Sequence, residues 1–289
     1  MSAATHGIVS AATHGIVSAA THGIVSAATL GIGIEGALAP QAVAELAALA
    51  ERSRYGSFWL NVPWSKHQPI ECLNQAIRST KTIEIGVGVF PLDAYPAPLL
   101  AEELAAIGAS MPRVIIGIAA GQIRQGVIPL VRGALTTLRR ALPNARLAIA
   151  GYGPKVLHLG GSAADVMLAN WLTPERLDWF LEQVRIGANA AGRTMPPVYL
   201  YHRAATGPDA VLRLRNELTE YRRYPVHQKH QAEMNNPEWI GIAAVDRTDI
   251  ARQLAPYGEC CQVVLKPLPK DGRDVAEWRS LVEFFAPRP

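Results

Sequence analysis

Short apolar runs alternate with longer amphipathic segments along most of the chain. The runs are rich in Val, Ile, Leu and Ala and are bounded by Gly, Pro or Asn, a pattern typical of buried parallel strands. The expected strands span residues 30–35, 57–61, 82–89, 113–118, 145–150, 163–169, 197–204 and 261–265. The expected helices span residues 40–54, 69–79, 96–110, 127–142, 155–160, 173–191, 209–224 and 275–285.

Eight strands that each precede a helix predict a (β/α)8 TIM barrel, in which the active site lies at the carboxyl ends of the strands. An open doubly wound α/β sheet is the alternative, because a strand count that is wrong by one or two would favour it. The length of 289 residues suffices for one large domain, which we place at residues 26–289.

The chain begins with a repeated octapeptide. SAATHGIV occurs three times in succession over residues 2–25, and an altered copy, SAATLGIG, follows. A period of eight is too short for a solenoid repeat, and the segment lacks the basic start of a signal peptide. We therefore expect residues 1–25 to be a loosely packed extension. The spacing of its histidines, His6, His14 and His22, does not favour a metal site.

The composition argues against several classes of protein. Charged residues make up 18% of the chain and the formal net charge is +4, but Lys and Arg are scattered, so nucleic acid is not expected as a partner. No apolar run is long enough to cross a membrane. The three cysteines, Cys72, Cys260 and Cys261, fit neither a disulfide framework nor a CxxC metal motif. We therefore expect a cytoplasmic protein that acts on a small molecule.

Residues 145–173 contain two successive transitions from strand to loop to helix. The first loop, Gly151-Tyr152-Gly153-Pro154, precedes a short helix whose free N–H groups and positive dipole end suit a phosphate. Thr173 is the expected N-cap of the second helix, with Pro174 in its first turn. The alternative is an ordinary pair of βα turns, because a GxGP sequence has low specificity by itself.

Four segments together carry a family resemblance: LAERSRYGSFWL (residues 49–60), IEIGVGVFPLDAYPAPLLAEELAAI (83–107), VIIGIAAGQ (114–122) and GYGPKVLHLGGSAADVMLANWLTPE (151–175). The chain resembles the luciferase-like oxidoreductases, which include bacterial luciferase, alkane and alkanesulfonate monooxygenases, and reductases that use the deazaflavin coenzyme F420. The last segment is similar to the family block GPKxLxLAGxxADGxxxxxxTPE. The resemblance implies a barrel that transfers hydride between reduced F420 and an organic substrate.

Two other functions remain open within this resemblance. One is an FMN-dependent monooxygenase, and the other is a catalytically silent paralogue that binds flavin or another ligand. The family also implies a homodimer, for which the Ala-rich helix at residues 99–107 is suited.

The resemblance also assigns roles to residues. It implies a non-prolyl cis peptide bond at Gly88-Val89 against the coenzyme ring, Gly121 beneath that ring, and a phosphate site at the start of the short helix. The implied cofactor-binding residues are Gly33, Gly88, Val89, Gly121, Gly151, Gly153, Pro154, Lys155, Asn170, Trp171, Leu172 and Thr173. Trp64 and Gln122 are catalytic candidates from the resemblance, and His202 is a third because it lies near a strand end.

Departures from the family pattern bear on the chemistry. Gln122 stands where some deazaflavin-dependent members have an acidic glutamate, and an amide cannot exchange a proton near neutral pH. The histidine that precedes the Pro-Trp pair in those members is absent before Pro63-Trp64, and Val166 replaces the glycine of the ADG motif. The segment between Gly121 and Ala145 is short, which predicts an open pocket.

Four further expectations concern polar side chains. Tyr152 is a candidate to stack or donate near the cofactor, and Asp165 is expected to accept structural hydrogen bonds. His158 is expected to be exposed on its helix. The histidines of YPVHQKH, His227 and His230, are expected in a solvated loop.

Overall fold

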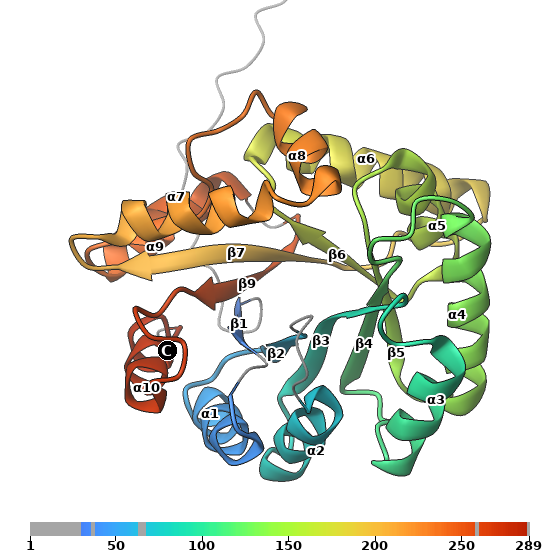
Figure 1. Ribbon diagram of the computed structural model, residues 1–289, viewed down its shortest axis with the longest axis horizontal. Helices are drawn as coiled ribbons and strands as arrows, with labels where there is room; N and C mark the ends of the chain where they lie inside the picture. The colour runs from blue at the N-terminus through green and yellow to red at the C-terminus, as the bar shows by residue number, and fades with distance from the viewer. Residues whose placement is uncertain (1–29, 36–37, 63–67, 258–259, 288–289) are drawn as a thin grey trace, which may run out of the picture.

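A computed structural model describes residues 30–35, 38–62, 68–257 and 260–287 of the chain. Eight parallel strands form a closed ring in which β6 pairs with β7 and β1 pairs with β9 (Figure 1). The ring is built from β1 (Leu30–Glu35), β2 (Ser57–Asn61), β3 (Glu84–Pro91), β4 (Val114–Ala119), β5 (Arg146–Ala150), β6 (Val166–Asn170), β7 (Val198–Thr206) and β9 (Gln262–Pro267). The fold is therefore a (β/α)8 barrel, as the sequence predicted, and the open sheet is excluded.

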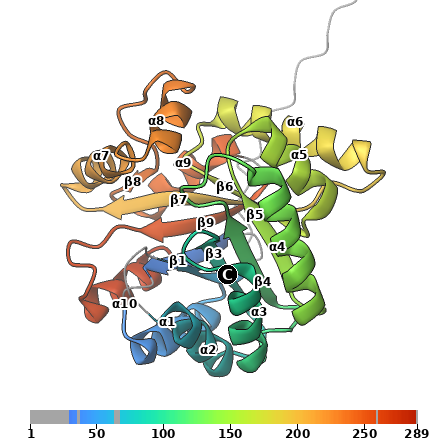
Figure 2. The same cartoon turned by 45° about the vertical axis from the view of Figure 1, so that its right-hand side comes forward.

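Helices cover the outside of the ring (Figure 2). They are α1 (Pro40–Arg52), α2 (Pro69–Ser79), α3 (Ala97–Ala106), α4 (Val127–Ala141), α5 (Pro154–Ala163), α6 (Pro174–Ala190), α7 (Ala210–Tyr221), α8 (Pro225–Ala232), α9 (Arg247–Leu254) and α10 (Val275–Phe284). No helix in the described part of the chain is long and apolar enough to cross a bilayer.

The segment between α7 and β9 differs from the prediction. The sequence suggested loop there, but the structure has α8, the short strand β8 (Ile242–Ala244) and α9. β8 pairs with Ala204, Ala205 and Thr206 at the far end of β7, outside the closed ring. The segment was missed because it is polar and short of apolar residues, so its helices show no clear apolar stripe.

The interior of the barrel is a packed core. Trp59, Tyr199 and Tyr201 form its centre, with the Trp59 ring 5.0 Å from the Tyr199 ring and 5.6 Å from the Tyr201 ring. Glycines on the facing strands make room for these rings, because a Cβ on Gly88 would lie 2.7 Å from Cζ of Tyr201. The interior is thus filled by side chains, as in other barrels of this size.

An ion pair closes the amino-terminal end of the barrel. Arg146 lies 2.6 Å from Oε1 of Glu84, and the Tyr199 hydroxyl donates to Oε2 of Glu84 at 2.5 Å. Burial, together with the neighbouring Glu84 carboxylate, raises the pKa of Tyr199 well above its usual value, so the phenol keeps its proton. Glu84 therefore joins β3 to both β5 and β7 at this end of the barrel.

Two glycines bring α5 and α6 into backbone contact. A Cβ on Gly161 would lie 2.7 Å from the Ala188 nitrogen and closer still to the Val184 carbonyl oxygen. A Cβ on Gly187 would lie 2.5 Å from Cα of His158. This close approach fixes two helices whose first turns follow the carboxyl ends of β5 and β6.

Helix α7 folds over the extended end of β7. Ala205 and Leu268, at the ends of β7 and β9, pack with Ala210 and Leu214 of α7 in a separate apolar cluster. Glu217 and Tyr221, further along α7, contact Arg203 of β7. Helix α7 therefore covers the side of the barrel mouth that β7 and β9 form.

Candidate functional site

The barrel mouth is defined by the last interior positions of the strands. Trp59, Leu168, Tyr201 and Val264 belong to the interior core. Because side chains alternate along a strand, the residues two positions further on also face inward. These are Asn61, Asn170, Arg203 and Lys266, and the same alternation places Glu35 and Gly88 beside them.

Lys266 lies at the centre of the polar side of the mouth. Its Nζ is 2.5 Å from Oε1 of Glu35 and 3.0 Å from Oε1 of Glu217. With the Asn61 amide oriented to suit its neighbours, its oxygen accepts from Nζ at 3.3 Å, and its nitrogen donates to the Gly88 carbonyl at 3.2 Å. All three ammonium donors of Lys266 thus have an acceptor, each on a different element.

The charges at this site stabilise one another. Burial alone would lower the pKa of Lys266, but Glu35, Tyr221 and Glu217 raise it above its usual value. Burial would raise the pKa of Glu217, but Lys266 and Arg203 lower it overall. Lys266 and Glu217 are therefore both ionised at neutral pH.

Arg203 is the second buried cation of the mouth. Its guanidinium donates to Oδ1 of Asn170 and lies 3.5 Å from Oε1 of Glu217. The same group stacks over the Trp171 ring at 3.9 Å and faces the Tyr221 ring at 4.9 Å. Arg203 therefore joins β6, β7 and α7 at one point.

The opposite side of the mouth is small and apolar. Gly88, Val89, Ala119 and Ala150 are half-buried at the carboxyl ends of β3, β4 and β5, and we call them the small-residue shelf. Val89 and Ala150 rest on the interior core. The peptide bond between Gly88 and Val89 is cis, which confirms the expectation drawn from the family resemblance. The mouth is therefore half apolar shelf and half charged network.

Comparisons with known proteins concern this same architecture. No family model matches the sequence, and no curated protein matches it. Among solved structures, a coenzyme F420-dependent tetrahydromethanopterin reductase from Methanopyrus kandleri superposes with a TM-score of 0.69 at 14% identity, over 89% of this chain and 97% of the other. The chain has the same (β/α)8 barrel fold as this reductase.

Two further solved structures share this fold. An F420-dependent secondary alcohol dehydrogenase, in complex with an F420-acetone adduct, superposes with a TM-score of 0.68 at 18% identity, over 89% of this chain and 97% of the other. The oxygenating constituent of 3,6-diketocamphane monooxygenase from Pseudomonas putida, in complex with FMN, gives a TM-score of 0.63 at 13% identity over the same shares. At these identities the likeness establishes the fold.

In this barrel His202 does not face the mouth. It lies on the outer face of β7, with its ring 4.5 Å from the Tyr257 ring. Burial, and to a lesser extent Arg203, lowers its pKa to about 3, so it is neutral. Our expectation for His202 was wrong because the period of two along β7 places Tyr201 and Arg203 inward and His202 outward.

Gln122 lies at the surface of the loop that follows β4. Its backbone N–H donates to Oδ2 of Asp93 at 2.8 Å, and its exposed side chain accepts from Arg124 at 2.7 Å. Gly121 adopts a φ of +67°, and a Cβ there would lie 2.7 Å from Oδ2 of Asp93 and closer to other atoms of that carboxylate. Glycine is thus required by the turn itself.

The loop after β5 is covered by α8. The Tyr152 hydroxyl lies 3.0 Å from Nδ1 of His227, and the Tyr152 ring stacks on His230 at 3.8 Å. At the start of α5, Gly153, Pro154 and Lys155 are exposed. Because the Val156 and Leu157 N–H groups both bond to the Gly153 carbonyl and Pro154 has none, the Lys155 N–H is the donor that this turn leaves for an anion.

Two expected wall residues are packed inside the protein. Trp171 and Leu172 are each 1% exposed, and their carbonyl groups accept from His230 and Tyr257. Thr173 caps α6 as predicted, since its side chain accepts from the Arg176 N–H. These contacts give Trp171 and Leu172 a structural role beneath the mouth.

The remaining candidates have mixed outcomes. Gly33 lies in the interior, where a Cβ would be 3.4 Å from Val264 and 3.5 Å from Tyr201. Asp165 accepts from the Leu147 N–H at 2.9 Å, which confirms its structural role. His158 is half-buried, with Nε2 3.0 Å from Gln183, so the expectation of exposure was wrong. Trp64, its neighbour His67 and the octapeptide repeats lie outside the described residues.

The loop predicted around His227 and His230 is helical and packed. His230 is buried, and Nε2 lies 2.9 Å from the Trp171 carbonyl. Burial is the main cause that lowers the pKa of His227 to about 3 and of His230 to about 4. Both rings are therefore neutral in the folded state at physiological pH, and α8 seals the loop after β5.

We expect α8 to loosen in mild acid. Both histidines have folded pKa values below the unfolded value of about 6.5, so the stability that their neutral state provides is complete above pH 6.5 and is lost as the pH falls towards 4. Below pH 6.5, the linkage between protonation and unfolding lowers the hydrogen-exchange protection of the α8 amides about tenfold per pH unit for each histidine. Hydrogen exchange of the α8 amides at pH 7.5 and pH 5 measures this loss, with the α2 amides as an internal reference. Equal protection of α8 at both pH values, after correction for intrinsic rates, would contradict it.

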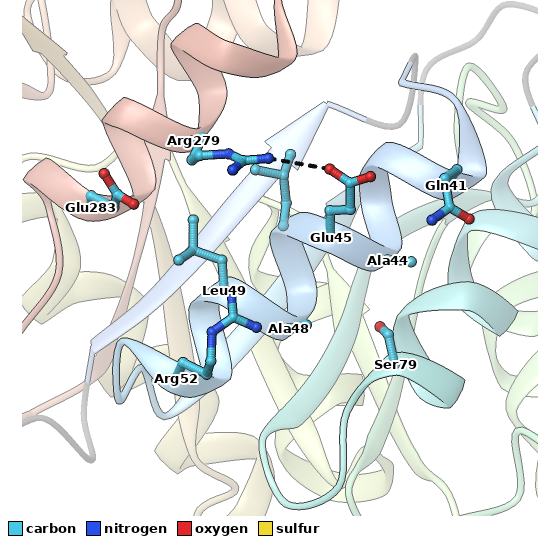
Figure 3. A pocket seen from close by; sticks show the side chains of 10 residues that line it. Gln41, Ala44, Glu45, Ala48, Leu49, Arg52, Ser79, Arg279 and Glu283 are labelled. Atoms are coloured by element: carbon cyan, nitrogen blue, oxygen red, sulfur yellow. Dashed lines mark hydrogen bonds and ion pairs between the residues drawn. The ribbon is translucent and has the colours of Figure 1, made fainter.

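A pocket outside the barrel is separate from the mouth. It has a volume of about 470 Å³ and lies between α1, the end of α2 and α10 (Figure 3). Leu49, Ala44 and Ala48 supply an apolar floor, and Arg279 pairs with Glu45 at 3.3 Å across its edge. Its lining residues come from the outer faces of helices, so it does not communicate with the residues of the mouth.

Proposed function

We propose that this chain is an oxidoreductase that holds a flavin-type coenzyme, preferably the deazaflavin F420, at the barrel mouth and exchanges hydride with a small organic substrate. The observation that carries the proposal is the division of the mouth into an apolar shelf and a polar network. The similar structures support it, because two of them are F420-dependent and one is in complex with FMN.

The residues of the mouth fit such a coenzyme. A flavin or deazaflavin ring is flat, with one apolar end and one end that carries hydrogen-bonding nitrogen and oxygen atoms. The small-residue shelf offers a surface without protruding side chains for the ring. Asn61 and Asn170 present amides on the polar side, and Lys155 adds a positive charge where a phosphate would be held. When bound, the coenzyme supplies or accepts the hydride.

Glu35 is the mouth residue best placed to exchange a proton with substrate. Its side chain is 32% exposed, and its Oε2 has no partner among the described residues, whereas Oε1 is held by Lys266. Asn61 and Gln122 cannot serve, since amides do not titrate. Glu35 therefore offers a carboxyl group at the mouth, which Gln122 lacks because it stands where some members of the resembled family have a glutamate.

Equilibrium titration with F420 and with FMN tests the proposal. We expect F420 to bind more tightly than FMN and its affinity to fall with added salt, because phosphate is held partly by charge. Replacing Lys155 with glutamine should weaken F420 binding about twofold to fivefold, as expected for one exposed charge pair. Lys81→Gln is the matched control, since Lys81 is exposed just before β3 at the amino-terminal end of the barrel.

Other outcomes of the titration would redirect the proposal. Tighter binding of FMN would favour a monooxygenase. Failure of both coenzymes to bind at high micromolar concentration would favour a catalytically silent paralogue.

The homodimer stays a prediction. On the helix expected at its interface, the Leu99 side chain is 60% exposed.

A further inference from the structure

One long segment of the chain carries only positive charge. Residues 104–164 contain seven Lys and Arg residues and no Asp or Glu, whereas acidic residues outnumber basic ones in the rest of the chain. The segment runs from the end of α3 through β4, α4, β5 and α5. Its charge is therefore concentrated on one side of the barrel.

Three of these seven cations are engaged within the protein. Arg113 donates to backbone carbonyls, with the shortest bond 2.7 Å to Ile77. Arg146 pairs with Glu84, and Arg139 pairs with Asp165 at 3.2 Å. The other four have no acidic partner among the described residues, and we call them the basic track: Arg124, Arg132, Arg140 and Lys155.

The basic track leads from the mouth down the outside of the barrel. Arg124 lies in the loop after β4 and Lys155 in the first turn of α5, both at the carboxyl ends of strands. Arg132 and Arg140 follow on α4, which lies beside α5 (Figure 2). They are eight residues apart, a rise of about 12 Å along the helix axis.

A groove accompanies the lower part of the basic track. It has a volume of about 350 Å³ and lies between α4 and the end of α5 at Ala163. The groove is lined by Arg132, Arg140 and Thr136. Arg139 also lines it, but its charge is paired with Asp165. Cations and a hydroxyl along one groove suit an extended ligand with several negative groups rather than a compact one.

We infer that the basic track binds an anionic tail of the coenzyme, a chain of several carboxylates that leaves the mouth and runs along α4. The inference rests on the proposed function and narrows it. F420 carries a phosphodiester followed by a chain of glutamyl carboxylates, whereas FMN ends in a single phosphate. A ligand that ends at the mouth meets Arg124 and Lys155, and only one with a longer tail reaches Arg132 and Arg140.

The test compares short-tailed and long-tailed F420 by fluorescence titration at low salt. We expect the long-tailed form to bind the wild-type protein about threefold to tenfold more tightly, since two additional exposed pairs each contribute modestly. In the double variant Arg132→Gln/Arg140→Gln this advantage should disappear, while the affinity for the short-tailed form changes less than about twofold. Added salt should remove the advantage in the wild type as well.

A charge-matched variant controls for net charge. Arg54→Gln/Arg78→Gln removes two exposed arginines near the ends of α1 and α2, and it should keep the preference for the long tail. No preference in the wild type, or a preference that survives in Arg132→Gln/Arg140→Gln, would overturn the inference while leaving the proposed function intact. Failure of both forms of F420 to bind would overturn the proposed function, and the inference with it.

Discussion

The Gly161→Ala variant should unfold at a much lower urea concentration than the wild type, with a loss of about 3 kcal/mol or more in the free energy of unfolding. The added Cβ would lie 2.7 Å from the Ala188 nitrogen and closer to the Val184 carbonyl oxygen. Both atoms belong to the backbone of α6, which cannot move aside as a flexible side chain can. The two helices would have to separate, and the loops that precede them would shift at the mouth.

Gly133→Ala is the matched control for this substitution. Gly133 lies in α4, and no atom lies within 4 Å of the position that its Cβ would take. Alanine there should stabilise the protein by about 0.5 to 1 kcal/mol, because it lowers the backbone entropy of the unfolded chain. Equal stability of Gly161→Ala and wild type would mean that α5 and α6 are farther apart than the structure shows.

Replacing Lys266 with methionine should cost about 3 to 5 kcal/mol at neutral pH. The side chain of Lys266 is 3% exposed, and its loss leaves Glu35 and Glu217 facing each other without the cation between them. Adding Glu35→Gln to this variant should restore part of the loss, because Lys266 is the cation that pairs with Glu35 among the described residues, whereas Glu217 keeps its contact with Arg203. Urea unfolding of the two variants measures both effects.

The pH dependence of Lys266→Met follows from the same contacts. The folded pKa of Glu217 is lowered, so its contribution to stability is present above its ordinary value of about 4.5 and is lost as the pH falls through the lowered value. The deficit of the variant should therefore shrink in acid. Lys270→Met, which changes an exposed lysine four residues on, should leave stability within about 0.5 kcal/mol at both pH values. A deficit that is constant with pH would show that the loss arises from packing rather than charge.

The strands and most helices were predictable because their signals are local. The run LAIA before Gly151 and the Thr173-Pro174 helix start each need only a few neighbouring residues to be recognised. The cis peptide bond was placed at Gly88 and Val89 through the family resemblance rather than through a physical rule.

The charged network of the mouth was missed because its members are distant in sequence. Glu35, Glu217 and Lys266 meet through the closure of β9 onto β1 and the return of α7 over β7. One local signal was available: Arg203 and Lys266 each lie near the carboxyl end of a mainly apolar strand. Because side chains alternate along a strand, an inward Tyr201 predicts that Arg203 faces inward and His202 outward. The packing of α8 had no such signal, since its contacts with Tyr152 and Trp171 depend on the tertiary fold.

The sealed amino-terminal end of the barrel has a kinetic consequence. Trp59, Tyr199 and the Glu84 to Arg146 ion pair fill the described interior below the mouth, so a ligand that enters at the mouth is expected to leave by the same side. Under the proposed function, a coenzyme ring on the small-residue shelf would lie deeper than a substrate placed above it. Binding should therefore be ordered: the coenzyme enters first and leaves last, and an excess of substrate should trap it in place.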